Sequence, residues 1–334
     1  MKILVTGAAG FIGFHLSQKL LGQGHEVVGL DALTSYYDPR LKQTRLELLR
    51  QQAGFGFGKV DLTDAVALEA FIAETKAEVV FHLAAQPGVR YSIENPQSYI
   101  QSNVVGTANL LETLRRHQPT HLIFASTSSV YGGNEIMPYA ETDRADSPLS
   151  LYAATKKSGE ALVHSYSHLW GIPATCVRFF TVYGAYGRPD MALLKFATKI
   201  EAGSPIDVYG NGQMRRDFTY VEDLVAALAA VMPRVPVLGE PVEGDSLSAV
   251  APFRLLNIGG GRPVELMDFI ASLERAMGRK AELNMLPMQP GDVVATEADT
   301  ALLQALVGEL PCTPLDEGID RFVAWFRDYA KVEA

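Results

Sequence analysis

The sequence has only two cysteines in 334 residues, Cys176 and Cys312. They stand far apart and unaccompanied, so we expect neither a disulfide framework nor a zinc site. We interpret both as reduced thiols of a cytoplasmic protein. His164 and His168 are one helical turn apart, but no third ligand is apparent. We therefore place both histidines on a helix surface or a dimer face, and we expect no metal.

Long apolar runs and an excess of basic residues are also lacking. No apolar stretch is long enough to span a bilayer, and no signal peptide is visible, so we expect no membrane segment. The net charge is −9. Nucleic-acid-binding proteins are more often basic, so the charge disfavours such a partner. The 48% hydrophobic and 20% charged residues suit a soluble globular protein with a sizeable core.

The N-terminus carries a glycine turn between a buried strand and a helix. Residues 3–5 form a short apolar run that is typical of a buried parallel strand, and a helical pattern begins at Phe11 and Ile12. The glycines between and just beyond are Gly7, Gly10 and Gly13. They permit a tight turn, close approach to a pyrophosphate and close helix–strand packing. Because the spacing is G-x-x-G-x-x-G, a glycine-rich turn of another α/β protein stays an alternative at this point.

The next strand ends in an acidic residue. Residues 27–30 are an apolar run followed by Asp31. Counted from the glycine turn, Asp31 stands where a carboxylate accepts hydrogen bonds from an adenosine ribose. No arginine follows immediately to bind a 2′-phosphate, so we predict NAD rather than NADP as the cofactor.

Strand and helix patterns then alternate. We expect strands that end near Asp61 and that cover residues 79–85 and 122–125, and helices over 64–75 and 97–117. The alternation predicts an α/β fold with a doubly wound, Rossmann-type parallel sheet, whose ligands bind beyond the carboxyl ends of the strands. His82 lies inside an apolar strand, and we interpret it as a packed core histidine. The residues expected beside the cofactor at these strand ends are Asp61, Leu62, Leu83, Ala84 and Ala85.

The C-terminal part has the pattern of a smaller, mixed α/β lobe. Residues 231–252 are rich in proline and glycine and lack periodicity, so we expect a surface insertion. The elements expected after it are a strand at 255–258, helices at 263–278 and 316–330, and a short strand near 281–286. The predicted domains are an NAD-binding Rossmann domain over 1–180, with segments near 216–232 and 253–260 interleaved, and a mainly substrate-binding domain over 181–334.

A hydroxyl cluster and a tyrosine–lysine pair indicate redox chemistry. Residues 126–129, Ser-Thr-Ser-Ser, follow the strand that ends at Ala125. Tyr152 and Lys156 are four residues apart in a helical segment, so they share a face. A nearby ammonium lowers the pKa of a phenol, and such a tyrosine can take a proton from a hydroxyl while hydride leaves the same carbon. A turn that bonds its own backbone and an exposed i,i+4 pair are the alternatives.

These motifs resemble those of extended short-chain dehydrogenase/reductases that modify nucleotide sugars, and most of all the UDP-glucuronate 4-epimerases. The likeness covers nearly the whole chain. The matching stretches are residues 6–13, 31–37, 82–86, 89–92, 127–132, 151–157, 178–184, 187–192, 216–220 and 289–292. One departure is Pro87, where a small residue such as alanine is expected near the sugar.

The resemblance implies an NAD-dependent isomerase that epimerises UDP-glucuronate to UDP-galacturonate at C4, through a 4-keto sugar and without decarboxylation. Tyr152, helped by Thr127, takes the O4 proton while C4 hydride passes to NAD. The sugar then rotates, and hydride returns to its opposite face. Lys156 supports Tyr152, and the resemblance places Asn103 behind Lys156 as its hydrogen-bond partner beside the cofactor.

The resemblance also assigns the substrate contacts. Related decarboxylases and dehydratases carry acids in the hydroxyl segment, with a glutamate expected at the position of Ser129, whereas this chain has hydroxyls only. A 4-keto uronic acid loses carbon dioxide readily, and hydrogen bonds that hold its carboxylate in the sugar plane disfavour that loss. The candidates for those bonds are Ser128, Ser129 and Thr181, with Arg188 as a neighbouring counter-charge. Arg216 is expected on the UDP diphosphate and Asp292 near the uridine ribose.

Two other functions stay open. One is a 4-epimerase of neutral UDP-hexoses, which has no need of carboxylate-holding groups at Thr181 and Arg188. The other is a non-catalytic NAD-binding scaffold, against which an intact Tyr152–Lys156 pair argues. The resemblance further implies a homodimer formed through the helices around 99–117 and 151–170. Arg90 is left undecided between a substrate contact and a dimer contact.

Overall fold

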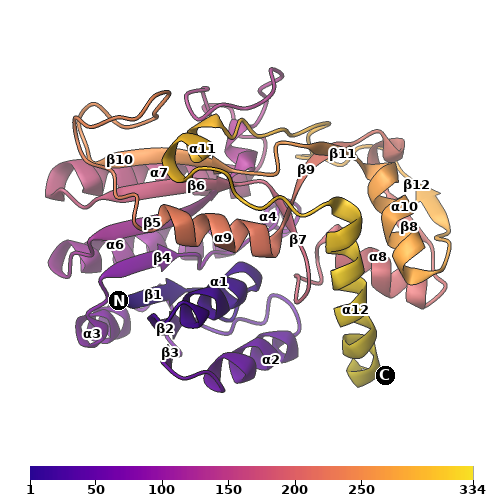
Figure 1. The fold of residues 1–334 in the computed structure, drawn as a ribbon, viewed down its shortest axis with the longest axis horizontal. Helices are drawn as coiled ribbons and strands as arrows, with labels where there is room; N and C mark the ends of the chain where they lie inside the picture. Colours follow the sequence, from indigo (N-terminus) through magenta and orange to yellow (C-terminus); the bar gives the residue numbers. More distant parts are fainter. Residues whose placement is uncertain (334) are drawn as a thin grey trace.

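The computed structural model describes residues 1–333 and contains a seven-stranded parallel sheet with helices on both faces (Figure 1). Its strands, in order across the sheet, are β10 (Phe253–Ile258), β6 (Ala174–Phe179), β5 (His121–Thr127), β4 (Val79–His82), β1 (Lys2–Thr6), β2 (Glu26–Leu30) and β3 (Phe55–Gly58). Six of these strands follow the Rossmann order 3-2-1-4-5-6. The predicted doubly wound sheet is therefore confirmed.

The strands are apolar because both faces of the sheet are covered. Side chains alternate along β1, so Ile3 and Val5 pack in one core cluster and Leu4 in another. Helices α1 (Phe11–Gly22) and α9 (Val221–Val231) contribute to the first cluster. The helices that contribute to the second are α3 (Ala65–Thr75), α6 (Gly106–Arg116) and α7 (Leu151–Trp170). A further helix that the sequence did not indicate, α2 (Pro39–Arg50), lies beside α1 and β3.

The helix predicted over 97–117 is present but interrupted. Short helices α4 (Tyr91–Glu94) and α5 (Pro96–Tyr99) lead into a π-helical turn, η1 (Ile100–Val105), before α6 begins. Such turns widen the helix by one residue and are frequent at functional sites. Asn103, inside this turn, is buried.

His82 is a buried core histidine, as predicted. Its Nδ1 lies 2.8 Å from Thr6 Oγ1, and its Nε2 lies 3.1 Å from Thr107 Oγ1. Burial lowers the pKa of His82 to about 3, so the ring is neutral near pH 7.

The C-terminal half adds two small sheets and further helices, most of which Figure 1 shows at one end of the large sheet, whereas α11 lies against β10 and α9. The three-stranded sheet comprises β7 (Thr181–Tyr183), β9 (Arg215–Tyr220) and β11 (Pro263–Glu265), and the two-stranded sheet comprises β8 (Ile206–Val208) and β12 (Leu283–Met285). The helices are α8 (Ala192–Glu201), α10 (Leu266–Met277), α11 (Ala301–Val307) and α12 (Leu315–Glu333). Three short 3-10 or π turns complete the list, of which η2 (Ser128–Tyr131) and η3 (Tyr209–Gly212) are 3-10.

Two expectations for this half need correction or addition. The helix predicted over 263–278 begins only at Leu266, because Pro263–Glu265 pairs antiparallel with β9 as strand β11. Helix α8 was not indicated by the sequence pattern. Among the described residues, none of the helices combines the length and apolar character that crossing a membrane requires.

The predicted insertion after α9 has no helix or strand between residues 233 and 252. Both histidines of α7 bind it: His164 Nε2 lies 2.9 Å from Ser248 Oγ, and His168 Nδ1 lies 2.6 Å from Val250 O. Asp245 of the insertion also forms a buried ion pair of 2.7 Å with Arg254 of β10. The insertion is therefore tied to the edge of the large sheet.

Candidate active site

The glycine turn that joins β1 to α1 is packed too closely for side chains at Gly7 and Gly13. Gly7 has φ +73°, and a Cβ there would lie 2.9 Å from Ala84 N. A Cβ on Gly13 would lie 2.1 Å from Gly7 O, so the helix starts in direct contact with the turn. Gly10 is the N-cap of α1, and it offers no side-chain cap to the first N–H groups of the helix. These N–H groups and the helix dipole suit an anion such as a pyrophosphate.

A cavity of about 420 Å³ lies beyond the carboxyl ends of the strands, where a sheet of this type binds ligands. Of the residues predicted for the site, those that line it are Gly7, Gly10, Phe11, Ile12, Gly13, Asp31, Asp61, Leu62, Leu83, Ala84, Ala85, Thr127, Ser128, Ser129, Tyr152, Lys156, Thr181 and Arg188. The cavity thus brings together residues from the end of β2 to the loop after β7. Pro87 also lines it.

Asp31 lies at the β2 end of this cavity. Its carboxylate accepts hydrogen bonds from the backbone N–H groups of Ala9 (3.2 Å) and Leu33 (2.8 Å). Burial raises the pKa of Asp31, and the nearby Lys42 ammonium counteracts that rise. Two hydroxyl donors from a ribose would satisfy the oxygen lone pairs that these two bonds leave.

Thr127 and Tyr152 meet where β5 ends and α7 begins. Thr127 Oγ1 donates to Ser129 Oγ (3.3 Å) and accepts from Ser129 N (3.2 Å). Helix α7 starts at a serine cap, because Ser150 Oγ accepts from Ala153 N. Tyr152 is the second residue of this helix, and its side chain lines the cavity.

The electrostatics of Tyr152 differ from the expectation. Burial raises the pKa of Tyr152, and the groups that counteract the rise are Arg188 and the Thr127 hydroxyl, rather than Lys156. Burial also lowers the pKa of Lys156, to about 8. The Lys156 ammonium lies 4.3 Å from the centroid of the Phe124 ring, a cation–π contact.

Asn103 does not line the cavity, and its partners differ from the expected one. Its side chain accepts from Gln86 N (2.7 Å) and donates to Gln86 O (3.0 Å) and to Thr155 Oγ1 (3.0 Å). It thus binds the loop after β4 to α7 beside Lys156, instead of binding Lys156 itself. The π-helical turn directs this side chain inward, which the sequence pattern did not reveal.

Arg216 and Asp292 are not among the residues that line the cavity. The Arg216 guanidinium donates to the carbonyls of Val293 (2.6 Å) and Val294 (2.9 Å). Asp292 forms an ion pair of 2.9 Å with Arg90, whose guanidinium also lies 4.2 Å from the centroid of the Tyr209 ring. Arg216 of β9 is therefore bonded to the segment that follows Asp292.

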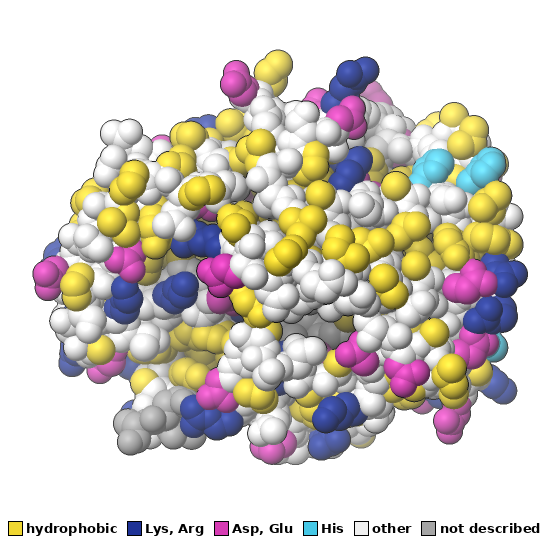
Figure 2. All heavy atoms as spheres, turned by 180° about the vertical axis from the view of Figure 1, so that it is seen from behind, with side chains coloured by type: hydrophobic (Ala, Val, Ile, Leu, Met, Phe, Trp, Pro, Cys, Tyr) yellow, Lys and Arg dark blue, Asp and Glu magenta, His cyan; other side chains and the backbone are white. Residues whose placement is uncertain are grey.

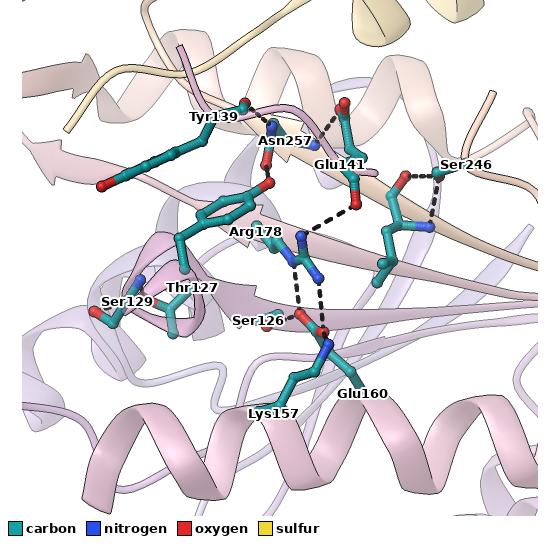
Figure 3. Close-up of polar contacts among 12 residues, drawn as sticks. Ser126, Thr127, Ser129, Tyr139, Glu141, Lys157, Glu160, Arg178, Ser246 and Asn257 are labelled. Carbon is teal, nitrogen blue, oxygen red and sulfur yellow. Dashed lines mark hydrogen bonds and ion pairs between the residues drawn. The ribbon is translucent and has the colours of Figure 1, made fainter. Parts of the chain in front are cut away.

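Sequence reasoning missed a buried charge network behind the hydroxyl cluster. Glu160 Oε1 accepts from Ser126 Oγ (2.6 Å) and from Arg178 Nε (2.9 Å), and Glu160 Oε2 accepts from Arg178 and Lys157 (Figure 3). The same figure shows Arg178 reaching the Glu141 carbonyl. This network joins β5 and β6 to α7. The sequence feature that could have indicated this network is the spacing of Lys156 and Glu160, which are one helical turn apart.

Sequence reasoning also missed the partners of Arg188. Asp190 accepts two hydrogen bonds from Arg188, at 3.0 Å from Nε and 2.7 Å from Nη2, and one from the Tyr36 hydroxyl at 3.0 Å. The Arg188–Asp190 separation of two residues could have indicated the pair. Nothing in the local pattern could have indicated Tyr36.

Comparisons with known proteins find similarity over nearly the whole chain. The model of the NAD dependent epimerase/dehydratase family matches residues 3–241. A probable UDP-glucuronate 4-epimerase from Rhizobium meliloti is 52% identical over 331 residues, which are 98% of this chain and 97% of that protein.

Two solved structures extend the comparison. The UDP-glucuronic acid 4-epimerase from Bacillus cereus, in complex with UDP-glucuronic acid and NAD, is similar with a TM-score of 0.87 and 34% identity, covering 98% of this chain and 100% of that one. The UDP-glucose 4-epimerase from Thermotoga maritima, with UDP-glucose, has a TM-score of 0.85 and 29% identity, covering 99% and 100%.

Proposed function

Because the chain belongs to the NAD dependent epimerase/dehydratase family, we propose that it is an isomerase that epimerises UDP-glucuronate to UDP-galacturonate at C4. The observation that carries the proposal is one cavity that joins a glycine turn and Asp31 to Thr127, Tyr152 and Arg188. Redox groups and carboxylate-binding groups thus face the same space. The similar epimerases from Rhizobium meliloti and Bacillus cereus support it.

NAD fits the first half of this cavity. The glycine turn leaves no room for a Cβ at Gly7 or Gly13 and presents the start of α1 to a pyrophosphate. The Asp31 carboxylate receives the ribose hydroxyls. When bound, NAD supplies the hydride acceptor and donor that the reaction needs. Because the reaction consumes none of it, the glycine turn has to hold the cofactor through every turnover.

Tyr152 moves the proton of the reaction. It takes the proton of the sugar O4 hydroxyl and returns it once the sugar has rotated, with the Thr127 hydroxyl orienting that proton. Arg188 and Thr127 counteract the effect of burial on the pKa of Tyr152. Lys156, on the same helix face, adds a second positive charge.

The hydroxyl cluster and Arg188 hold the carboxylate of the sugar. Ser128, Ser129 and Thr181 line the cavity beside Arg188. The 4-keto sugar is a β-keto acid, which loses carbon dioxide most readily when its carboxylate turns out of the sugar plane. Hydrogen bonds from these hydroxyls keep the carboxylate in that plane, and the chain has no acid at the position of Ser129 to repel it.

The remaining predictions are part of the proposal. Arg216 would give up its hydrogen bonds to the carbonyls of residues 293–294 and contact the UDP diphosphate instead, and Asp292 would contact the uridine ribose.

Homodimerisation would use the face formed by α6 and α7. The exposed hydrophobic side chains of this region, Ile100, Val105, Leu169 and Trp170, support that choice, and Figure 2 shows hydrophobic side chains in a band across the surface seen from behind. A cytoplasmic location stays a prediction.

Proton NMR of the purified protein with UDP-glucuronate and no added NAD tests the function. We expect UDP-galacturonate to form, and Tyr152→Phe to slow its formation by about 10²–10⁴-fold with no loss of folding. Ser129→Glu should release a UDP-pentose. A wild-type protein that releases a UDP-pentose would be a decarboxylase. One that turns over only UDP-glucose would be a neutral-hexose epimerase, like the similar Thermotoga maritima protein.

A further inference from the structure

The guanidinium of Arg188, which lines the cavity, already has a partner in Asp190. Asp190 occupies the Nε and Nη2 edge of Arg188 with two hydrogen bonds. This is one of the two edges at which a carboxylate can bind an arginine with two parallel bonds. The Nη1 group is left outside the pair, so a substrate carboxylate meets a smaller part of the guanidinium.

The pair also changes the charge of the cavity. Arg188 and Asp190 together are neutral, and both are ionised near pH 7. Burial on its own raises the pKa of Asp190, but the Arg188 charge and the Tyr36 hydroxyl outweigh burial and hold that pKa below its usual range. A sugar carboxylate that enters the cavity therefore meets a local dipole instead of a full positive charge.

Tyr36 fixes Asp190 from a distant part of the chain. Its hydroxyl donates to Asp190 Oδ2, and its ring packs on Tyr91 with the centroids 4.9 Å apart. The backbone at Gly88 closes over this contact, because a Cβ there would lie 2.8 Å from the Tyr36 hydroxyl. Three loops thus converge on Asp190, and its carboxylate has little freedom to turn away from Arg188.

The loop that carries Arg188 is held in place as well. Buried Arg45 donates to the carbonyls of Tyr186 (2.6 Å) and Gly187 (3.3 Å), and to Ala9 O (3.0 Å) in the glycine turn. The backbone just before Arg188 is therefore tied to the cofactor end of the cavity.

We propose that Asp190, held by Tyr36, is a specificity-determining positioning residue for the carboxylate of the substrate. It keeps the Nε/Nη2 side edge of Arg188 occupied, so the carboxylate can reach Arg188 only at its Nη1 end and rests mainly on the hydroxyls of Ser128, Ser129 and Thr181. This rests on the proposed function. A carboxylate drawn onto a free Arg188 would leave the sugar plane, and carbon dioxide would be lost from the 4-keto sugar.

Asp190→Asn tests the role, because the amide keeps the shape while it removes the charge and one acceptor. The freed Arg188 should bind the ground-state carboxylate more tightly but in a poorer geometry. We expect KM for UDP-glucuronate to fall, kcat to fall about tenfold, and the ratio of UDP-pentose to UDP-galacturonate to rise about tenfold, measured by NMR. Tyr36→Phe should change all three in the same directions by about threefold.

Asp328→Asn is the matched control, since Asp328 is exposed on α12 and pairs with a neighbouring lysine, Lys331, one turn away. It should leave both products and both constants unchanged. If Asp190→Asn lowers kcat while KM and the product ratio stay the same, the role of Asp190 is overturned. Should Asp190→Asn fail to fold, unchanged products in Tyr36→Phe would overturn it. A wild-type protein that makes no UDP-galacturonate would instead refute the proposed function.

Discussion

Two arginine–carboxylate pairs, Arg178–Glu160 and Arg188–Asp190, have the same chemistry but differ in burial and in their further partners. Arg178 and Glu160 are 1% and 3% exposed, behind the ends of β5 and β6. Arg188, which lines the cavity, and Asp190 are 22% and 27% exposed. Both pairs have two hydrogen bonds between fork and carboxylate.

The difference between them lies in what surrounds the carboxylate. Glu160 also accepts from Ser126 and Lys157, and Arg178 also reaches a carbonyl, so each charge is bonded within the scaffold (Figure 3). Asp190 has one further donor, Tyr36, and Arg188 keeps Nη1 outside the pair. A buried pair of this kind holds elements together, whereas a half-open pair retains capacity for a ligand.

Arg178→Met should give the largest effect on stability, because it leaves the Glu160 charge buried without its main partner. We expect the free energy of unfolding to fall by about 3–5 kcal/mol, measured by urea denaturation. The double variant Arg178→Met, Glu160→Leu is the control, and it should lose less because no unpaired charge remains. If the Arg178→Met variant were as stable as wild type, the buried Arg178–Glu160 pair would not hold the scaffold together.

Glu160→Gln should give a smaller loss that depends on pH. Burial raises the pKa of Glu160, but Arg178, Lys157 and Ser126 outweigh it and hold the pKa below its usual range. A carboxyl with a lowered folded-state pKa contributes stability above its unfolded pKa of about 4.3, and loses that contribution as the pH falls through the folded value.

The difference in unfolding free energy between wild type and Glu160→Gln should therefore be about 1–3 kcal/mol at pH 7 and should shrink below about pH 4. Urea denaturation at several pH values measures it. Other titrating groups, such as His82, are common to both proteins and cancel. A difference that grows as the pH falls would contradict the assigned sign.

Glu317→Gln should give the smallest effect and sets the lower end of the scale. Glu317 pairs with Arg321 one turn along α12, and both side chains are about half exposed. Exposed pairs of this kind contribute little, so we expect a change within about 0.5 kcal/mol in the free energy of unfolding. A loss comparable to that of Arg178→Met would mean that burial does not separate these ion pairs.

Several parts of the fold and the site were predictable because their signals are local. The glycine spacing, the apolar strands and the i,i+4 spacing of Tyr152 and Lys156 depend only on neighbours in the chain. The cavity then followed from a rule about parallel sheets, which places ligands at the carboxyl ends of the strands. The pKa of Tyr152 was not predictable, because burial acts against the nearby charges.

Other parts depended on contacts across the chain. The pattern of residues 100–105 is helical, and only the packing around Asn103 revealed a π-helical turn and the bonds to Gln86 and Thr155. The same holds for Tyr36, which is far from Asp190 in the sequence and touches it in space.

Local sequence patterns were enough for the class of the fold and the position of the glycine turn, because hydrophobic periodicity and glycine spacing act over a few residues. The tertiary contacts were needed to show which arginine is buried in the scaffold and which one lines the cavity. Arg178 lies in strand β6 of the large sheet and Arg188 follows strand β7 of the three-stranded sheet, and the two side chains carry the same charge. Their burial and their partners arise from packing between distant segments, which no local pattern encodes.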